Sequence, residues 1–177
     1  MSKPDGASIH ANVVVVGEAG VLIRGPSGAG KSQLSLALVD EAHARGRYGA
    51  LVADDRTFLS AEHGRLIARG APGFEGLIEQ RGEGLIRLGF EPSTVVRLVV
   101  DLPRRGAVAP RWPEEEARSD DMLGVALPRL AADLSMGVIH AARLTLRKLA
   151  FDSPENVRQL VISLDHRAAV HKNVTGA

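Results

Sequence analysis

Short apolar runs separated by turn residues fill the first third of the chain. Residues 12–16 and 21–24 consist mostly of valine, leucine and isoleucine, and the glycines between them predict a tight turn that joins two strands. Residues 31–45 carry leucine and alanine at helical spacing without an internal glycine or proline, which predicts a helix. Residues 50–53 form a further apolar strand, which ends in two adjacent aspartates.

Glycine is frequent in the middle of the chain. Residues 56–60 and 65–69 flank a turn and predict a hairpin. The glycine-rich residues 70–89 are expected to form loops that line a site rather than a core. Residues 94–101 predict a strong strand, and the charged residues 103–121 predict a loop.

A helical pattern returns near the C-terminus. Residues 136–151 have apolar side chains at helical spacing and basic side chains on the other face. Ser153, Pro154 and Glu155 are typical of a helix start, so we expect a last helix through Leu164 and a frayed tail after it. The basic residues near this end are expected to form a solvated surface rather than a docking site.

Length and composition limit the classes of function. The chain has 177 residues, so we expect one domain over residues 1–177, with a core over about 8–150 and a C-terminal helix and tail over 151–177. The net charge is +1 and aromatic residues make up 3%, which argues against nucleic acid and against an anionic membrane surface as partners. The absence of cysteine excludes disulfides, thiolate metal sites and a cysteine nucleophile. No apolar stretch approaches the roughly 18 residues of a membrane span, and these observations are consistent with a cytoplasmic protein.

A phosphate-binding motif lies between the second strand and the first helix. The pattern G-x-x-x-x-G-K-[ST] is matched in each fixed position by Gly25, Pro26, Ser27, Gly28, Ala29, Gly30, Lys31 and Ser32. In this motif the backbone N–H groups surround phosphate oxygens, the lysine reaches the β and γ phosphates, and the final hydroxyl ligates Mg²⁺. We therefore predict that the chain binds ATP or a similar nucleotide with Mg²⁺. The alternative is a glycine-rich turn without a ligand.

A phosphate-binding loop indicates a nucleotide but not a reaction. Phosphoryl transfer to an alcohol also needs a second metal contact and a base for the hydroxyl proton. Asp54 and Asp55 are the leading candidates, since one could bind the metal while the other acts as base. Adjacent strand-end side chains point to opposite faces, which is compatible with two roles. The alternative is a pair of solvated turn residues.

Three further residues complete the candidate site. A hairpin through residues 17–20 would bring His10 beside the loop, where it could hydrogen-bond an aspartate and hold it ionised. Glu79 and Arg81 lie near glycines and offer a carboxylate suited to metal and a guanidinium suited to phosphate. The alternatives are a surface histidine and a surface turn with a local ion pair.

Four features occur in order along the chain and together resemble the catalytic domain of HPr kinase/phosphorylase. They are His10, the phosphate-binding loop, the strand end Val52-Ala53-Asp54-Asp55 and the segment Glu79-Gln80-Arg81-Gly82-Glu83-Gly84. The resemblance implies an α/β fold with a P-loop core, in which a mixed central sheet is flanked by helices, with a helical C-terminus. It also implies a nucleotide-binding core related to that of phosphoenolpyruvate carboxykinase.

The resemblance further implies an activity and partners. The activity is ATP- and Mg²⁺-dependent phosphorylation of a regulatory serine on an HPr-like phosphocarrier protein of the phosphotransferase system. The assembly is a homo-oligomer, for which a hexameric ring is one form. Lys31 would bind the β and γ phosphates with Arg81 nearby, while Ser32 and Glu79 would contact Mg²⁺.

The resemblance also assigns the proton transfer. Asp55 would take the proton from the substrate serine, and it would return a proton in the reverse phosphorolysis. Asp54 and His10 would support Asp55 in this role.

The chain departs from the family pattern in three places. The family normally has an N-terminal domain ahead of the catalytic one. Only nine residues precede His10 here, so we expect a short form. Met122 stands where the family has an arginine after Asp121, and Arg118 and Arg111 are candidate replacements. The family segment R-P-G-R-N, used in dephosphorylation, has no counterpart around residues 127–130, which counts against reverse phosphorolysis.

The main hypothesis is therefore a serine kinase that acts on an HPr-like carrier. A P-loop kinase for a small-molecule alcohol is a second reading, although the glycine-rich segment offers little apolar surface for the acceptor pocket it would need. A non-catalytic ATP-sensing regulatory module is a third reading, and it is favoured if Met122 has disabled transfer.

Overall fold

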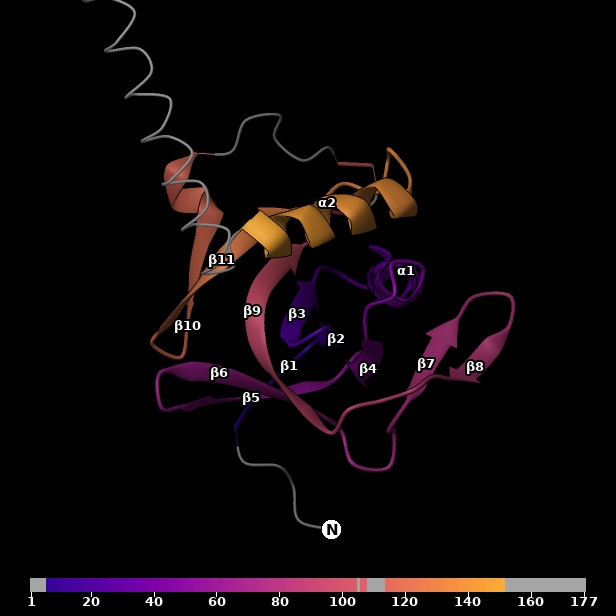
Figure 1. Ribbon diagram of the computed structural model, residues 1–177, viewed down its shortest axis with the longest axis horizontal. Coiled ribbons are helices and arrows are strands. Elements are labelled where there is room, and N and C mark those ends of the chain that lie inside the picture. Colours follow the sequence, from indigo (N-terminus) through magenta and orange to yellow (C-terminus); the bar gives the residue numbers. More distant parts are fainter. Residues whose placement is uncertain (1–5, 105, 108–113, 152–177) are drawn as a thin grey trace, which may run out of the picture.

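The computed structural model describes residues 6–104, 106–107 and 114–151, and it shows a large curled sheet with two α-helices against one face (Figure 1). The helices are α1 (Lys31–His43), α2 (Val138–Phe151) and the short 3-10 helix η1 (Glu115–Arg118). The strands of the large sheet are β1 (Ala7–Ile9), β2 (Ala11–Val16), β3 (Ala19–Arg24), β4 (Gly49–Ala53), β5 (Thr57–Glu62), β6 (Arg65–Gly70), β9 (Ser93–Asp101), β10 (Ser119–Met122) and β11 (Val125–Ala131). A separate hairpin pairs β7 (Leu77–Gln80) with β8 (Gly84–Arg87).

The sheet is mixed, and its order brings together strands that are far apart in sequence. The path runs β1-β5-β6-β9-β3-β2-β4, and β11 pairs with β9 and β10. β3 is antiparallel to β2 but parallel to β9. β9 is long and curved: its start pairs with β6, while its end pairs with β11 (Figure 1). The carboxyl ends of β3 and β9 therefore lie side by side, where ligands of α/β sheets commonly bind.

Both faces of the central strands are buried, which explains why β2 is almost wholly apolar. On the face covered by α1 and α2, Val14 and Val16 pack with Leu34 and Leu38 of α1. On the opposite face, Val13 joins a second apolar cluster that includes residues of β5 and β6. The sequence of a strand that is covered on both faces is a continuous apolar run rather than an alternation of apolar and polar residues.

The elements predicted for the first third of the chain are confirmed, with ends that differ by a few residues. The predicted strands correspond to β2, β3 and β4, the predicted helix to α1, and the predicted hairpin to β5 and β6. The predicted strong strand is β9. The predicted α/β class and mixed sheet are confirmed, and both described α-helices lie on the same face.

The structure differs from the prediction in the glycine-rich and charged segments. Residues 70–89, expected mainly to form loops that line a site, contain the hairpin β7–β8, and Ile78 of β7 is fully buried in the helix-side core, so the segment also contributes to the core. The segment 103–121, predicted as a loop, ends in η1 and enters β10. α2 begins at Val138 rather than at residue 136, because Gly137 before it has a left-handed φ of 95°. The predicted helix through Leu164 and the tail lie outside the described residues.

Among the described residues, no helix has the length and apolar character needed to span a membrane.

Candidate active site

The loop from Gly25 to Ser32 joins the end of β3 to the first turn of α1. Gly25, Gly28 and Gly30 have φ values of 152°, 76° and 100°, which residues with a side chain rarely adopt. A Cβ at Gly25 would lie 2.8 Å from the carbonyl oxygen of Leu102, so the loop also packs closely against the end of β9. Only glycine satisfies both requirements at position 25.

At the start of α1, neither an N-cap side chain nor a first-turn acidic residue competes with an anion for the backbone N–H groups. Its N-cap, Gly30, provides no side-chain hydrogen bond, and the first turn contains no acidic residue. The first N–H groups of a helix lack intrahelical acceptors, and the helix dipole adds partial positive charge there. The loop and helix start therefore form a cradle that fits an anion such as a phosphate group.

The ammonium group of Lys31 is directed back onto the loop. Its Nζ lies 2.8 Å from Nε2 of His10, 3.2 Å from the carbonyl oxygen of Gly25 and 3.4 Å from that of Pro26. An ammonium group has three donors, and these three acceptors match them. A bound phosphate would therefore have to replace at least one of these contacts.

His10 connects Lys31 to Asp55. Its Nδ1 lies 2.9 Å from Oδ1 of Asp55 and 3.1 Å from the backbone oxygen of the same residue. Because Nε2 accepts from the Lys31 ammonium, the ring proton belongs on Nδ1, which donates to Asp55. The predicted contact between His10 and an aspartate is confirmed, and the aspartate is Asp55.

Whereas Asp55 contacts His10, the Asp54 side chain contacts Ser32, the last residue of the phosphate-binding loop. Its Oδ1 accepts from Ser32 Oγ at 3.1 Å and from Asn12 Nδ2 at 2.5 Å, and its Oδ2 accepts from the backbone N–H of Glu79 at 3.1 Å. The two adjacent aspartates thus take different partners, as predicted for a strand end.

Burial changes the protonation of the central charged groups. Burial raises the pKa of Asp54, and hydrogen bonds from Glu79, Ser32 and Asn12 offset this only in part. Burial also lowers the pKa of Lys31, and the negative charges of Asp55 and Asp54 offset this only in part. Both groups would be stabilised in their charged forms by ligands of opposite charge, a cation beside Asp54 and a phosphate beside Lys31.

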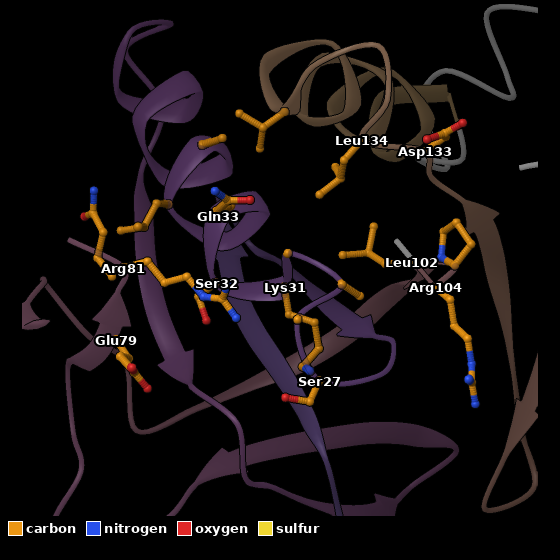
Figure 2. Close-up of a pocket in the computed structure, with 18 of the residues that line it drawn as sticks. Ser27, Lys31, Ser32, Gln33, Glu79, Arg81, Leu102, Arg104, Asp133 and Leu134 are labelled. Carbon is orange, nitrogen blue, oxygen red and sulfur yellow. The ribbon is translucent and has the colours of Figure 1, made fainter. Parts of the chain in front are cut away.

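A cleft of about 1010 Å³ opens over the loop. Glu79 and Arg81 lie on one side of Lys31, and Leu102 and Arg104 lie on the other (Figure 2). The Nη2 atom of Arg81 would lie 3.8 Å from a Cβ placed on Gly28, so its guanidinium extends over the loop. Apolar side chains of α1, α2 and the segment before α2 also line the cleft: Leu36, Ala37, Leu134, Val138 and Ile139.

The oxygen donors at the end of the loop fit Mg²⁺ bound together with a nucleotide. Magnesium prefers oxygen ligands and usually combines one or two carboxylates with phosphates and water. Ser32 and Asp54 are in direct contact, and Glu79 lines the same cleft. In the part of the chain that the structure describes, no group of three or more His, Cys, Asp or Glu could hold a metal. The donors therefore suit a shared site rather than a cage made by the protein.

The structure brings together all the predicted site residues but not the proposed replacements for Met122. Met122 packs against the apolar cluster on the face away from the helices. Among the described residues, the arginines that line the cleft are Arg81 and Arg104, and Arg118 is not one of them. Arg111 lies outside the described residues.

Asn12 belongs to the site and was not predicted from the sequence. Its side chain is 1% exposed and contacts Asp54 and the backbone N–H of Asp55. The signal was present, because Asn12 is the only polar residue of β2 and lies two positions from His10, on the same face of the extended chain.

Comparisons with known proteins agree with this arrangement. The sequence profile described as "HPr Serine kinase C-terminal domain" matches residues 4–138. HPr kinase/phosphorylase of Bordetella pertussis is 34% identical over 158 residues, which cover 80% of this chain and 49% of that protein. The Mycoplasma mycoides protein of the same name is 32% identical over 125 residues, which cover 67% of this chain and 36% of that protein.

A solved structure gives the same result at the level of the fold. The HPr(Ser) kinase/phosphatase from Coxiella burnetii superposes with a TM-score of 0.63 at 27% identity, covering 83% of this chain and 99% of that one. The chain spans about a third to a half of the length of the curated relatives described above. On the profile match over residues 4–138, the chain belongs to the HPr serine kinase family and corresponds to its C-terminal domain.

Proposed function

We propose that this chain transfers the γ-phosphoryl group of ATP, with Mg²⁺, to a regulatory serine of an HPr-like phosphocarrier protein. The observation that carries the proposal is the continuous contact from Lys31 in the phosphate-binding loop through His10 to Asp55. This contact joins a group suited to phosphate with a carboxylate suited to accept a proton. The names of the relatives support HPr as the acceptor.

The phosphate-binding loop and the cationic side chains of Lys31 and Arg81 would hold the triphosphate. Backbone N–H groups of the loop and the start of α1 would bind phosphate oxygens. Lys31 would exchange its carbonyl and imidazole contacts for the β and γ phosphates, and Arg81 would approach from above Gly28. Catalysis would then consist mainly of positioning and charge neutralisation.

Ser32, Asp54 and Glu79 would hold Mg²⁺. With Mg²⁺ held there, these residues would place a positive charge beside the phosphate oxygens on which negative charge develops. Asn12 and the backbone N–H of Glu79 orient the Asp54 carboxylate while leaving Glu79 free to extend into the cleft.

Asp55 would act as the base. Its side chain is 73% exposed, so the serine of a protein substrate could reach it. As the serine oxygen bonds to the γ-phosphorus and the bond to the β-phosphate oxygen breaks, the serine proton would pass to the Asp55 carboxylate. His10 would hold that carboxylate by donating from Nδ1. The exposure favours a protein acceptor over a small-molecule alcohol, which would need an enclosed pocket.

The proposal includes a homo-oligomeric enzyme that acts in the cytoplasm and binds neither nucleic acid nor a membrane. It does not include reverse phosphorolysis, because the segment associated with that activity in the family has no counterpart here. The family resemblance supports the assembly, and sedimentation velocity of the purified chain would measure it.

One observation favours a second function, that of an ATP-sensing module. Met122 packs against the apolar cluster on the far side of the sheet, so the position where the family has an arginine supplies no charge to the cleft. A module of this kind would bind ATP and change partners without transferring a phosphoryl group.

A labelling experiment separates the two functions. The purified chain is incubated with γ-labelled ATP, Mg²⁺ and purified HPr-like carriers, and label on serine is measured. We expect labelling that falls by about 100-fold or more in Lys31→Ala and in Asp55→Asn, the size typical of losing a charge-stabilising group or a catalytic base. Arg143→Ala, which removes an exposed pair with Glu41, serves as the control and should label normally.

One result would decide against the kinase, and another would decide against Asp55 as its base. ATP binding without serine label on any carrier would support the sensing module instead. Undiminished label in Asp55→Asn would remove the proposed base. Addition of inorganic phosphate after labelling then tests whether the label can be returned.

A further inference from the structure

Asn12 is a buried amide in a strand that is otherwise apolar. The strand β2 has the sequence Ala-Asn-Val-Val-Val-Val, and every residue in it is buried. A buried amide is unfavourable unless its donors and acceptor find partners. A valine at this position would continue the pattern of the strand, so the amide needs a reason other than packing.

The amide of Asn12 contacts both members of the aspartate pair. Its Nδ2 donates to Oδ1 of Asp54 at 2.5 Å, and its Oδ1 accepts from the backbone N–H of Asp55 at 3.0 Å. Longer contacts of 3.4 Å join Nδ2 to the hydroxyls of Ser32 and Ser35. The opposite orientation of the amide would place its oxygen against a carboxylate and its NH₂ group against an N–H group, so the partners fix which atom is which.

The backbone of Asp55 depends on this support. Its φ is 63°, in the left-handed region that residues other than glycine rarely adopt. Asn12 binds its N–H group, and His10 lies 3.1 Å from its carbonyl oxygen. The two supporting side chains are two positions apart at the start of β2 and face the same way. They therefore hold Asp55 at both of its backbone polar groups.

We propose that Asn12 is a positioning residue for phosphoryl transfer, which holds the Asp54 carboxylate against Ser32 and fixes the Asp55 backbone so that its carboxylate faces the acceptor hydroxyl. This inference rests on the proposed function. Among the described residues, the hydrogen bonds and ion pair of the His10 ring are with Asp55 and Lys31, whereas Asn12 joins the aspartate pair to the last residue of the phosphate-binding loop.

A matched pair of variants separates hydrogen bonding from packing. Asn12→Val and Asn12→Thr have side chains of nearly the same shape, but only threonine has a hydroxyl that can donate to Asp54 or accept from Asp55. Displacement of a catalytic group by about 1 Å can cost roughly 100-fold in rate, so we expect Asn12→Val to lower kcat by about that factor. Asn12→Thr should recover about tenfold of this loss, since one hydrogen bond is worth about a factor of ten.

The affinity for nucleotide should hardly change in either variant. Asn12 contacts the proposed metal ligands Ser32 and Asp54 but neither the loop backbone nor Lys31, so the Kd for ATP measured without carrier and without Mg²⁺ should stay within about threefold of the wild-type value. Thr145→Val is the control: Thr145 is equally buried, but its hydroxyl donates to the carbonyl of Ala141 in α2. This variant should keep the wild-type kcat.

The outcomes distinguish this inference from the proposed function. Wild-type protein that labels no carrier would overturn both. Wild-type labelling together with an equal kcat in Asn12→Val and Asn12→Thr would overturn the role of Asn12 alone. If Asn12→Val is poorly folded by its urea midpoint, the kcat of folded Asn12→Thr decides, and a kcat equal to wild type overturns the role. The supporting structural result would be weaker protection of the Asp55 amide from hydrogen exchange in both variants than in the wild type, with the greater loss in Asn12→Val.

Discussion

Asp101 and Asp54 both lie at the ends of buried strands, on either side of the strand that leads into the phosphate-binding loop, but their surroundings differ. Asp101 ends β9, which borders β3 on one side, and Asp54 follows β4, which lies beyond β2 on the other side. Arginines donate hydrogen bonds to Asp101, whereas the hydrogen bonds that Asp54 accepts come from the neutral donors Asn12, Ser32 and the backbone of Glu79.

The cluster around Asp101 is matched in charge. Arg24 donates to both oxygens of Asp101, at 2.7 and 2.8 Å, and to Asp120 at 2.6 Å. Arg129 donates to Oδ2 of Asp101 at 2.5 Å. Burial alone would raise the pKa of Asp101, but the hydrogen bonds and charges of Arg24 and Arg129 outweigh burial and hold the pKa below its usual value.

The charges around Asp54 are not matched in this way. The nearby cation, Lys31, makes its contacts with His10 and two loop carbonyls, and the pKa of Asp54 is raised by burial. A carboxylate paired with arginines holds strands together, while a partly buried carboxylate without a hydrogen-bonded cation is available to a bound one. The difference separates a structural cluster from a site.

The largest expected effect is on activity. Asp54→Asn should lower kcat/KM for Mg-ATP by about 100-fold, because it removes a charge that would face the metal. Asp101→Asn should change it by less than about threefold, since Asp101 does not line the cleft. Initial rates of carrier labelling over a range of Mg-ATP concentrations measure both variants. Equal losses of kcat/KM in the two variants would contradict the assignment of Asp54 to the site and of Asp101 to a structural cluster.

The next effect is on stability, and it runs in the opposite direction. Asp101→Asn should lower the free energy of unfolding by about 2 kcal/mol, because it removes the charged acceptor of Arg129 and one of the two charged acceptors of Arg24. Asp54→Asn should change it by less than about 1 kcal/mol, because a neutral side chain removes the cost of burying the charge while losing some hydrogen bonds. Urea denaturation at neutral pH measures both, and a larger loss in Asp54→Asn would contradict the assignment of structural and site roles.

The smallest effect is on titration, where the two aspartates should differ in sign. The folded pKa of Asp101 is lowered, so its ionised form stabilises the fold above its unfolded value of about 4, and this stabilisation is lost as the pH falls through the folded pKa. The folded pKa of Asp54 is raised, so folding favours its protonated form. That contribution is present below about 4 and is lost as the pH rises through the folded pKa.

Carboxyl ¹³C NMR titration measures the two groups directly. The variants Asp54→Asn and Asp101→Asn assign the two resonances. Addition of Mg²⁺ with a non-transferable ATP analogue should lower the pKa of Asp54 and leave that of Asp101 unchanged. An Asp54 resonance that does not respond to Mg²⁺ would show that the metal contacts lie elsewhere in the cleft.

Local features of the sequence predicted the part of the site that is local. The phosphate-binding loop follows from consecutive residues with fixed backbone requirements, and β2, β3 and α1 follow from their apolar patterns. The contact between His10 and Asp55 was predictable because a single hairpin returns the chain to the loop. The roles assigned to these residues remain predictions.

The rest depends on the register of strands that are far apart in sequence. Asn12 was read as part of an apolar strand, and its partners became visible only when β2 paired with β4 at Val13 and Ala53. The glycines around Ile78 favour a loop-like segment that lines the site, and only the folded position of β7 shows that Ile78 enters the core. Pairing of β11 with β9 fixes where Arg129 lies, and no periodic pattern in either segment predicts that pairing.

The position of β9 beside β3 has a consequence for synthesis of the chain. Arg24 and Asp101 are 77 positions apart, so the strand that supports the phosphate-binding loop reaches it long after the loop itself has been made. Contacts over such separations form slowly because closing a long loop costs chain entropy. A nascent chain therefore carries a complete nucleotide motif before it has a nucleotide site. Since a ligand that binds only the folded state stabilises it by mass action, ATP would begin to favour folding only once β9 has joined the sheet.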